Sequence, residues 1–265
     1  MRNNIQINES SCATKSQSQL NEFMGASIGT GASIFDPVLC EIAYRWFCPI
    51  GGFIIDPFAG GSVRGIVAAA LGFNYFGIEL RKEQVDANKK QADKIIKGEV
   101  RPIWAIGDSA KLLSDQCKGQ YDLVFSCPPY ADLEIYSDDP SDLSNMTWEN
   151  FKKAYHKIIS LSVGCLKNDR FVVWVVGDVR SKDGLYRNLI GETISAFESS
   201  GAGYYNEAIL INSIGSLPVR AGRAFSASRK LGKMHQNVLV FVKGDWKKAV
   251  EACGDIEVAL PDVME

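Results

Sequence analysis

The stretch Phe53-Ile-Ile-Asp56-Pro57-Phe58-Ala59-Gly60-Gly61-Ser62 has the pattern of a short apolar strand that runs into a glycine turn and then a helix. Gly60 and Gly61 carry no Cβ, so their backbone can approach a ligand closely. In open α/β sheets, ligands bind at the carboxyl ends of strands, and this turn occupies such an end. The stretch therefore predicts a ligand site directly after the first strand.

An acidic residue favours a nucleotide-like ligand at this turn. Glu79 ends the next apolar run, Tyr75-Phe-Gly-Ile-Glu79, and follows Asp56 by 23 residues. An acid about 20 residues beyond a glycine turn is placed to accept hydrogen bonds from a ribose. The turn is neither GxGxxG nor a P-loop with its GK[ST], which argues against dinucleotides and nucleoside triphosphates. The alternative is that the glycines only tighten a strand–helix turn.

A second motif, Ser126-Cys127-Pro128-Pro129-Tyr130, follows another apolar run, Tyr121–Phe125. Two successive prolines fix the backbone and donate no hydrogen bond, so this rigid turn has carbonyls that are free to accept. Acceptors beside the flat Tyr130 ring suit a planar substrate with an amino group, such as a nucleobase turned out of its stack. A plain proline loop is the alternative.

Short apolar runs alternate with helical patterns along the rest of the chain. Strands are expected at Phe53–Ile55, Tyr75–Ile78, Pro102–Ile106, Tyr121–Phe125 and Phe171–Val176, and helices at 37–47, at 82–97 on the outside of the sheet, after Thr147 and beyond about residue 186. This alternation is typical of a parallel sheet covered on both faces. Ile209–Ile211 and Asn237–Val242 are expected to pair as a C-terminal antiparallel hairpin. The predicted fold class is α/β, Rossmann-like, with a mostly parallel doubly wound sheet.

Together these segments resemble the S-adenosylmethionine-dependent DNA methyltransferases that act on the exocyclic amino group of adenine (N6) or cytosine (N4). Asp56–Gly61 is similar to the family's DPFAGSG cofactor motif, and Cys127–Tyr130 is similar to its [DNS]PPY catalytic motif. Ser33–Pro37 resembles the segment that closes over the methionine end of the cofactor. Gly107–Ser109 falls where the family contacts the cofactor's adenine. The order of the motifs resembles the γ-type arrangement, and the resemblance covers roughly residues 30 to 180 plus the final strand.

The resemblance implies a class I methyltransferase fold, S-adenosyl-L-methionine as cofactor and no metal ion. The implied cofactor-binding residues are Ser33, Phe35, Asp36, Asp56, Phe58, Ala59, Gly60, Gly61, Glu79, Asp108 and Ser109. The implied catalytic residues are Cys127, Pro128, Pro129 and Tyr130. The implied partner is double-stranded DNA with its target base flipped out, and the implied context is restriction-modification.

Two residues depart from the family pattern. Ser62 replaces the last glycine of DPFAGSG, while Gly60 and Gly61 remain. Cys127 replaces the Asp, Asn or Ser whose oxygen would accept from the target amino group, and a thiol is a weak acceptor. Activity would then depend on the Pro128 carbonyl, and the usual indication of adenine or cytosine is lost. A rival chemistry has the Cys127 thiol add covalently to a pyrimidine, although in the family that does so the cysteine follows the prolines.

Composition restricts the remaining choices. The 29 Lys and Arg nearly balance the 31 Asp and Glu, so net charge gives no argument for nucleic acid and any basic surface must be local. The sequence shows no apolar run of the roughly 20 residues that span a bilayer, and seven scattered cysteines without a CxxC pair favour reduced thiols in a cytoplasm. Two histidines make a zinc site improbable. We expect a polar arm over 1–25, one methyltransferase domain over 26–250 and a tail over 251–265.

A basic loop at 212–235 is the predicted nucleic-acid contact. Its cations are Arg220, Arg223, Arg229, Lys230 and Lys233, and the stretch contains no carboxylate. Charge concentrated on such a segment suits phosphate contacts, and a solvated basic loop is the alternative. Five acids between Ala131 and Thr147 are expected to lie in a solvated loop: Asp132, Glu134, Asp138, Asp139 and Asp142. The alternative is that Asp132 or Glu134, nearest Tyr130, contacts the target base. Asp178 either lines the pocket or caps a turn.

The sequence therefore predicts a DNA base amino-methyltransferase. The alternatives are an RNA base methyltransferase and a catalytically inactive cofactor-binding nucleic-acid module. Few residues lie outside the sheet, so the surface that reads DNA sequence must be small or must come from a second subunit, as in a homodimer.

Overall fold

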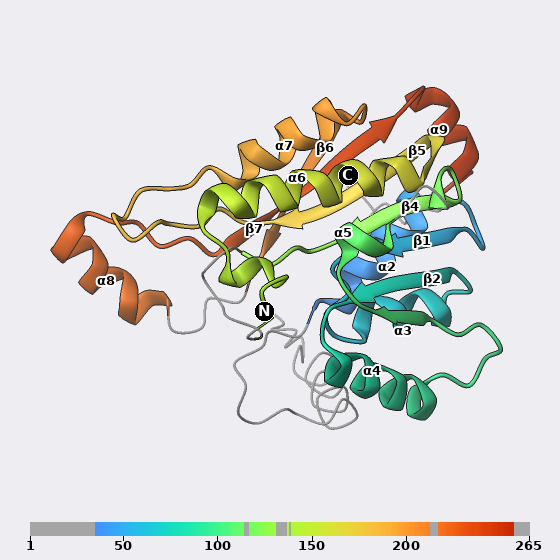
Figure 1. Cartoon of the computed structure of the whole chain (residues 1–265). Helices are drawn as coiled ribbons and strands as arrows, with labels where there is room; N and C mark the ends of the chain where they lie inside the picture. The colour runs from blue at the N-terminus through green and yellow to red at the C-terminus, as the bar shows by residue number, and fades with distance from the viewer. Residues whose placement is uncertain (1–34, 114–116, 131–136, 138, 213–216, 257–265) are drawn as a thin grey trace, which may run out of the picture. The chain divides into compact units, whose positions relative to one another are not determined.

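A seven-stranded sheet organises the chain in the order β3-β2-β1-β4-β5-β7-β6 (Figure 1). The strands are β1 Phe53–Asp56, β2 Asn74–Glu79, β3 Ile103–Ile106, β4 Tyr121–Ser126, β5 Leu166–Val176, β6 Gly203–Ile211 and β7 His235–Lys243. Strands β1 to β5 pair in parallel, and β7 lies antiparallel between β5 and β6. This computed structural model describes residues 35–113, 117–130, 137, 139–212 and 217–256. The predicted fold class, including the C-terminal antiparallel pair, is confirmed.

The helices begin where their sequence signals place them. They are α2 Pro37–Phe47, α3 Val63–Ala70, α4 Lys82–Ile95, α5 Ser109–Leu112, α6 Trp148–Cys165, α7 Leu189–Ser199, α8 Leu217–Ser228 and α9 Trp246–Cys253, with a short 3-10 turn at Leu143–Asn145. Asp36 caps α2 by accepting from the Val38 amide at 2.8 Å, and Pro37 fills the first helical position. Thr147 caps α6 by accepting from the Asn150 amide at 3.4 Å, as its position before Trp148 predicted.

Alternate residues of the strands build a core on each face of the sheet. Ile55, Val124, Val172 and Trp174 join the buried cluster under α6 and α7, two helices that lie along the same side in Figure 1. On the opposite face Tyr44 of α2 meets Phe125 of β4 with ring centroids 5.2 Å apart. Apolar side chains on both faces explain why the central strands read as nearly continuous apolar runs.

Strand β5 starts five residues earlier than its apolar run predicts, at Leu166 instead of Phe171. Four of the five added residues are polar, and Asp122 of β4 holds two of them, Lys167 at 2.9 Å and Arg170 at 3.0 Å. Ion pairing to a buried neighbour therefore extends a strand that hydrophobicity alone would end.

The segment between β6 and β7 contains a helix, so the expectation of a basic loop at 212–235 is wrong for residues 217–228. Because β6 and β7 are antiparallel to each other and β7 is antiparallel to β5, this segment leaves and re-enters the sheet at the carboxyl ends of β1 to β5. Figure 1 shows α8 beyond that edge. The predicted arm and most of the tail lie outside the described residues. No described helix combines the length and apolar character needed to cross a bilayer.

Candidate active site

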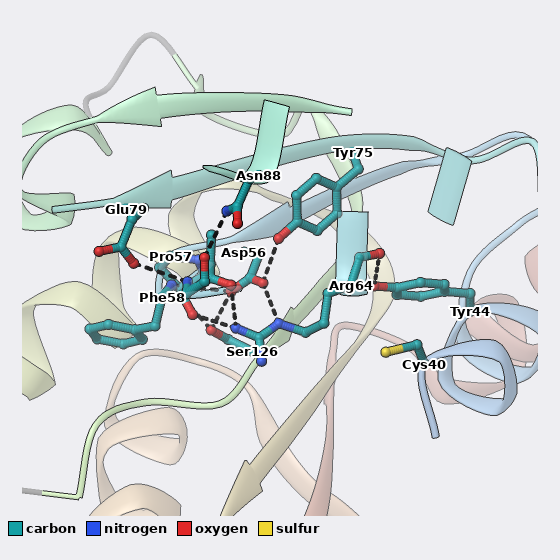
Figure 2. A network of polar contacts seen from close by, with 12 residues as sticks. Cys40, Tyr44, Asp56, Pro57, Phe58, Arg64, Tyr75, Glu79, Asn88 and Ser126 are labelled. Carbon is teal, nitrogen blue, oxygen red and sulfur yellow. Dashed lines mark hydrogen bonds and ion pairs between the residues drawn. The ribbon is translucent and has the colours of Figure 1, made fainter. Parts of the chain in front are cut away.

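The carboxylate of Asp56, at the end of β1, is fully buried and accepts four hydrogen bonds from this edge of the sheet (Figure 2). Oδ1 accepts from the Phe58 amide at 3.1 Å and from the Ser126 hydroxyl at 2.6 Å. Oδ2 accepts from the Tyr75 hydroxyl at 2.7 Å and from Arg64 Nε at 2.6 Å. These partners come from β4, β2 and α3, so Asp56 ties three elements to the glycine turn.

Arg64 balances this buried charge and reaches around the turn. Its Nη2 donates to the carbonyl of Ala59 at 3.0 Å and to that of Phe58. Burial disfavours the guanidinium, but the charge and hydrogen bond of Asp56, together with the nearby Tyr75 and Cys127, outweigh burial and raise the pKa of Arg64 above its ordinary value. The Asp56–Arg64 ion pair therefore stays charged and fixes the carbonyls that shape the turn.

The glycine turn itself is open on its outer side. Gly60 has φ +50°, which favours glycine, and a Cβ built on Gly61 would meet no heavy atom of the described residues within 4 Å. The Gly60 amide donates to Glu79 Oε2 at 3.0 Å, and the Gly60 carbonyl accepts from Asn88 Nδ2 at 2.7 Å. Asn88 lies on α4 and is fully buried, although that helix was expected on the outside of the sheet. The turn thus presents open backbone on one side and is held on the other by Glu79 and Asn88.

Strand β3 completes the same edge. Ser109 is buried and its hydroxyl donates to the Pro57 carbonyl at 2.5 Å, which joins the end of β3 to the end of β1. Asp108 caps α5 by accepting from the Ala110 amide at 2.8 Å. The Gly107 amide donates to the Glu79 carbonyl at 2.9 Å. Glu79, Asp108 and Gly60 therefore surround one edge region, while Ser109 supports it from within.

The segment before α2 is described from Phe35 onward, so Ser33 lies outside the described residues. The Phe35 ring packs edge-on against Phe125 at 5.7 Å, and the Arg64 guanidinium lies 4.6 Å from its centroid. Asp36 is exposed and caps α2. Phe35, in the middle of the predicted closing segment, therefore contacts Arg64 of the Asp56–Arg64 pair.

The turn after β4 meets the glycine turn through Ser126. Its hydroxyl donates to Asp56 and accepts from the Phe58 amide at 3.2 Å, so Ser126 faces inward. Cys127 is half-buried, with Sγ 3.8 Å from the Tyr130 hydroxyl. Pro128 is buried, and Tyr130 packs beside Gly177 at the end of β5, where an added Cβ would lie 3.6 Å from the ring. The two predicted motifs are brought together at one sheet edge.

The sequence interpretation missed the residues that hold this edge in place. Arg64, Tyr75, Asn88 and Ser126 contribute the buried bonds described above. A signal was present for Arg64, because a charged residue in the apolar helix Val63–Ala70 needs a buried partner. Nothing local marks Asn88, whose role depends on the packing of α4 against the turn.

Several predicted contacts lie farther along the same edge or outside the described residues. Asp178 accepts from the Val179 amide at 2.9 Å and from the Leu189 amide at 3.1 Å, so it caps a turn and the start of α7. Asp132 and Glu134 are outside the described residues. Asp142, expected in a solvated loop, is instead buried and accepts from Ser144 and Ser137. Arg223 and Arg229 are exposed on and just after α8, Lys230 and Lys233 are half-buried, and no side chain is described for Arg220.

Within the described ranges, no three His, Cys, Asp or Glu side chains gather where they could hold a metal ion.

Comparison with known proteins gives a match at the level of fold. No family model matches the sequence, and no curated protein matches it.

Solved structures of methyltransferases do match. TrmN from Thermus thermophilus has a TM-score of 0.53 at 13% identity over 84% of this chain and 52% of TrmN, so the chain spans about half the length of that protein. A SAM-dependent methyltransferase from Methanosarcina mazei has a TM-score of 0.53 at 10% identity over 80% of this chain and 99% of that protein. Magnesium protoporphyrin IX methyltransferase from Synechocystis, with bound SAH, has a TM-score of 0.52 at 10% identity over 87% and 95% of the two chains. The chain therefore has the Rossmann-like fold of these methyltransferases.

Proposed function

We propose that this protein transfers a methyl group from S-adenosyl-L-methionine to the exocyclic amino group of adenine (N6) or cytosine (N4) in DNA. One observation carries the proposal. The glycine turn after β1 and the Cys-Pro-Pro-Tyr turn after β4 end adjacent parallel strands, and the 2.6 Å bond between Ser126 and Asp56 joins them. A cofactor cradle and an amino-group acceptor thus lie side by side, as transfer between two bound molecules requires.

The residues at the edge fit this cofactor. The open backbone at Gly60 and Gly61 leaves room for a ligand, and Glu79 offers carboxylate oxygens to ribose hydroxyls beside it. Phe58 and Asp108 flank the same region, while Asp56, Ala59 and Ser109 are buried and act by holding the turn. When bound, the cofactor supplies a methyl group already activated on a positively charged sulfur.

The chain's own work is to orient the amino group. The lone pair of an exocyclic amino nitrogen is delocalised into the ring, so that nitrogen is a poor nucleophile. Accepting its hydrogens at the Pro128 carbonyl favours tetrahedral nitrogen, and the Tyr130 ring holds the base plane. Ser126 cannot replace the oxygen missing at Cys127, because its hydroxyl is bonded to Asp56. The Pro128 carbonyl is therefore the acceptor we assign.

Labelled cofactor tests this proposal directly. The protein is incubated with tritiated S-adenosylmethionine and either duplex DNA or RNA, and the nucleosides are separated by mass spectrometry. We expect N6-methyladenine or N4-methylcytosine in DNA. Methylated RNA alone would move the protein to the alternative substrate, and cofactor binding without transfer to either would identify an inactive module.

Two substitutions of Cys127 separate the amino-acceptor mechanism from covalent attack by the thiol. Cys127→Ser is expected to raise the turnover rate, because a hydroxyl oxygen is a better acceptor than a thiol. Cys127→Ala should keep measurable transfer, since the Pro128 carbonyl remains. If both variants lose all activity and the wild-type protein forms 5-methylcytosine, Cys127 is instead a nucleophile.

Glu79 tests the cofactor cradle separately from the chemistry. Glu79→Ala is expected to weaken S-adenosylmethionine binding on the order of 10-fold, the equivalent of one charge-assisted hydrogen bond. Calorimetric titration measures that affinity, with Glu83→Ala on the exposed side of α4 as the control. Equal affinity in the two variants would contradict the ribose contact.

A further inference from the structure

The turn between β5 and α7 presents an arginine stacked on a tyrosine. The guanidinium of Arg180 lies 3.8 Å from the centre of the Tyr186 ring, and its Nη1 donates to the Gly184 carbonyl at 2.8 Å. Arg180 and Tyr186 also pair across the turn as a short antiparallel bridge, which the Ser181 amide closes by donating to Leu185. The guanidinium of Arg180 is therefore held by residues of the turn itself.

The chain that follows α8 brings further cations to this turn. Lys230 lies so close that a Cβ built on Gly184 would be 2.9 Å from its Nζ, and Lys233 Nζ lies 6.0 Å from the centre of the Tyr186 ring. Arg229, Lys230, Arg180 and Tyr186 line a hollow of about 550 Å³, named here the tyrosine hollow. Elements more than forty residues apart in sequence thus converge on one concave surface.

The tyrosine hollow carries excess positive charge. Among the described residues, none forms an ion pair with Arg180, Arg229, Lys230 or Lys233. One carboxylate, Asp183, also lines the hollow, but it accepts hydrogen bonds from Ser181 and from the Leu185 amide within the turn. The cations are therefore available to an anionic ligand.

The tyrosine hollow adjoins a second hollow that lies near Tyr130 of the candidate active site. This second hollow, of about 310 Å³, shares Tyr186 with the tyrosine hollow and extends to Asp178 and His235. Gly177 precedes Asp178, and a Cβ added to it would lie 3.6 Å from the Tyr130 ring and 3.8 Å from the Gln236 side chain. The end of β5 therefore places the Tyr130 ring near the second hollow.

We infer that the tyrosine hollow binds the sugar–phosphate backbone of the DNA strand that carries the base placed at Tyr130, an inference that rests on the proposed function. Guanidinium groups bind phosphate oxygens through paired hydrogen bonds, and the Arg180 guanidinium is already held at the hollow by Tyr186 and the Gly184 carbonyl. Lys230 and Lys233 add positive charge on flexible side chains, which can bind phosphates in more than one position whatever the DNA sequence. Charge complementarity and the position of the adjoining hollow near Tyr130 select the flanking phosphates as the occupant.

Salt-dependent binding tests this inference. A fluorescent 20-base-pair duplex of mixed sequence is titrated with wild type and with Arg180→Gln/Lys230→Gln between about 50 and 300 mM salt. The double variant should bind at least about 10-fold more weakly at the low salt, and its salt slope should fall by roughly 2, since each lost phosphate contact removes about 0.9. Lys94→Gln/Lys97→Gln, which removes two exposed cations at α4, is the matched control and should bind as wild type does. A slope unchanged in the first variant would overturn the inference.

Substitutions of Tyr186 test whether the stacked position of Arg180, and not positive charge alone, is needed to bind the duplex. Tyr186→Phe keeps the ring under Arg180 and should bind the duplex normally, whereas Tyr186→Ala should lose several-fold in affinity. Equal binding by both would overturn the stacking role. Inorganic phosphate is titrated in parallel: if Arg180→Gln/Lys230→Gln loses phosphate binding but keeps duplex binding, the hollow is a small-anion site and the inference fails.

The outcomes separate this inference from the proposed function. If wild type transfers methyl to DNA while the double variant binds DNA unchanged, the inference fails and the function stands. If wild type transfers no methyl but the double variant loses duplex binding, the hollow is a DNA site and the methyl-transfer proposal fails. Cofactor titration should be unaltered in every hollow variant, which shows that each still folds.

Discussion

Asp56 and Arg64 show, at the scale of single residues, how a ligand turn is held without touching the ligand. A carboxylate with no exposed surface is costly unless its charge is balanced, and here one guanidinium both balances it and bonds two carbonyls of the turn. The Phe35 ring lies against the same guanidinium. One ion pair therefore links the glycine turn, the turn after β4 and Phe35, which precedes α2.

Arg64→Met should be strongly destabilising, because it leaves the carboxylate of Asp56 buried without a counter-charge. Breaking a buried pair by removing one partner costs about 3–5 kcal/mol. Urea denaturation measures the free energy of unfolding. Arg45→Gln is the control, since the Arg45–Glu41 pair is an exposed i,i+4 pair worth no more than about 0.5 kcal/mol. Similar losses in the two variants would show that Asp56 does not depend on Arg64.

Tyr130→Ala should abolish most methyl transfer while cofactor affinity stays within a few-fold of wild type. The ring packs beside Gly177 at the end of β5, so its loss misplaces the base by an amount that costs on the order of 100-fold in rate. Turnover is measured with saturating DNA, and cofactor affinity by calorimetry. Tyr130→Phe keeps the ring and should retain most activity. A parallel loss of rate and cofactor affinity would mean that the base pocket lies elsewhere.

At the scale of elements, α3 packs so closely on the sheet that one of its positions admits no side chain. A Cβ on Gly65 would lie 2.6 Å from Trp104, 3.0 Å from Pro102 and 3.1 Å from Tyr75. This approach brings Arg64, the preceding residue, within reach of Asp56. The glycine of the helix therefore serves the geometry of the edge.

Gly65→Ala and Gly164→Ala should change stability in opposite directions. Alanine is the better helix former by about 1 kcal/mol, but overpacking at residue 65 costs about 1–3 kcal/mol and should outweigh it. Apart from the backbone of α6 itself, no described atom lies within 4 Å of a Cβ added to Gly164, so Gly164→Ala should stabilise by up to about 1 kcal/mol. Thermal unfolding of the pair gives the comparison. Stabilisation by both substitutions would show that α3 does not need its close approach.

Most elements could be predicted from sequence because their signals are local. Apolar runs located β1 to β4 within a residue or two, and Asp36 and Thr147 marked the first turns of α2 and α6. The early start of β5 depends on Asp122, which is more than forty residues away, so no local pattern contains it. Helix α8 was missed because its proline, glycine and serines are residues typical of loops. Of the candidate site, the turns were predictable and the buried bonds between strands were not.

At the scale of the whole molecule, the thiols are a shared source of pH sensitivity. Burial raises the pKa of Cys253 from 9.0 to about 11 and that of Cys165 to about 12, and it raises the pKa values of Cys40 and Cys48 as well. The folded chain thus keeps protons that the unfolded chain releases above pH 9. Stability from this source is complete below pH 9 and is lost as pH rises through the folded pKa values.

We expect the free energy of unfolding to fall between pH 9 and about 11, with each fully protected thiol contributing up to about 1.4 kcal/mol per pH unit. Urea denaturation at a series of pH values gives the slope. Cys253→Ala should lower the slope by the share of one thiol, whatever its effect at neutral pH. A slope identical to that of wild type would show that Cys253 ionises alike in both states.

The antiparallel placement of β7 has an architectural consequence. Eight residue pairs hold β6 to β7, and seven hold β7 to β5, so the two ends of the intervening chain are clamped in register independently of what lies between them. Doubling a flexible connection adds only about 0.6 kcal/mol of closure entropy. The segment that carries α8 can therefore vary in length and composition between related proteins without disturbing the neighbouring candidate active site.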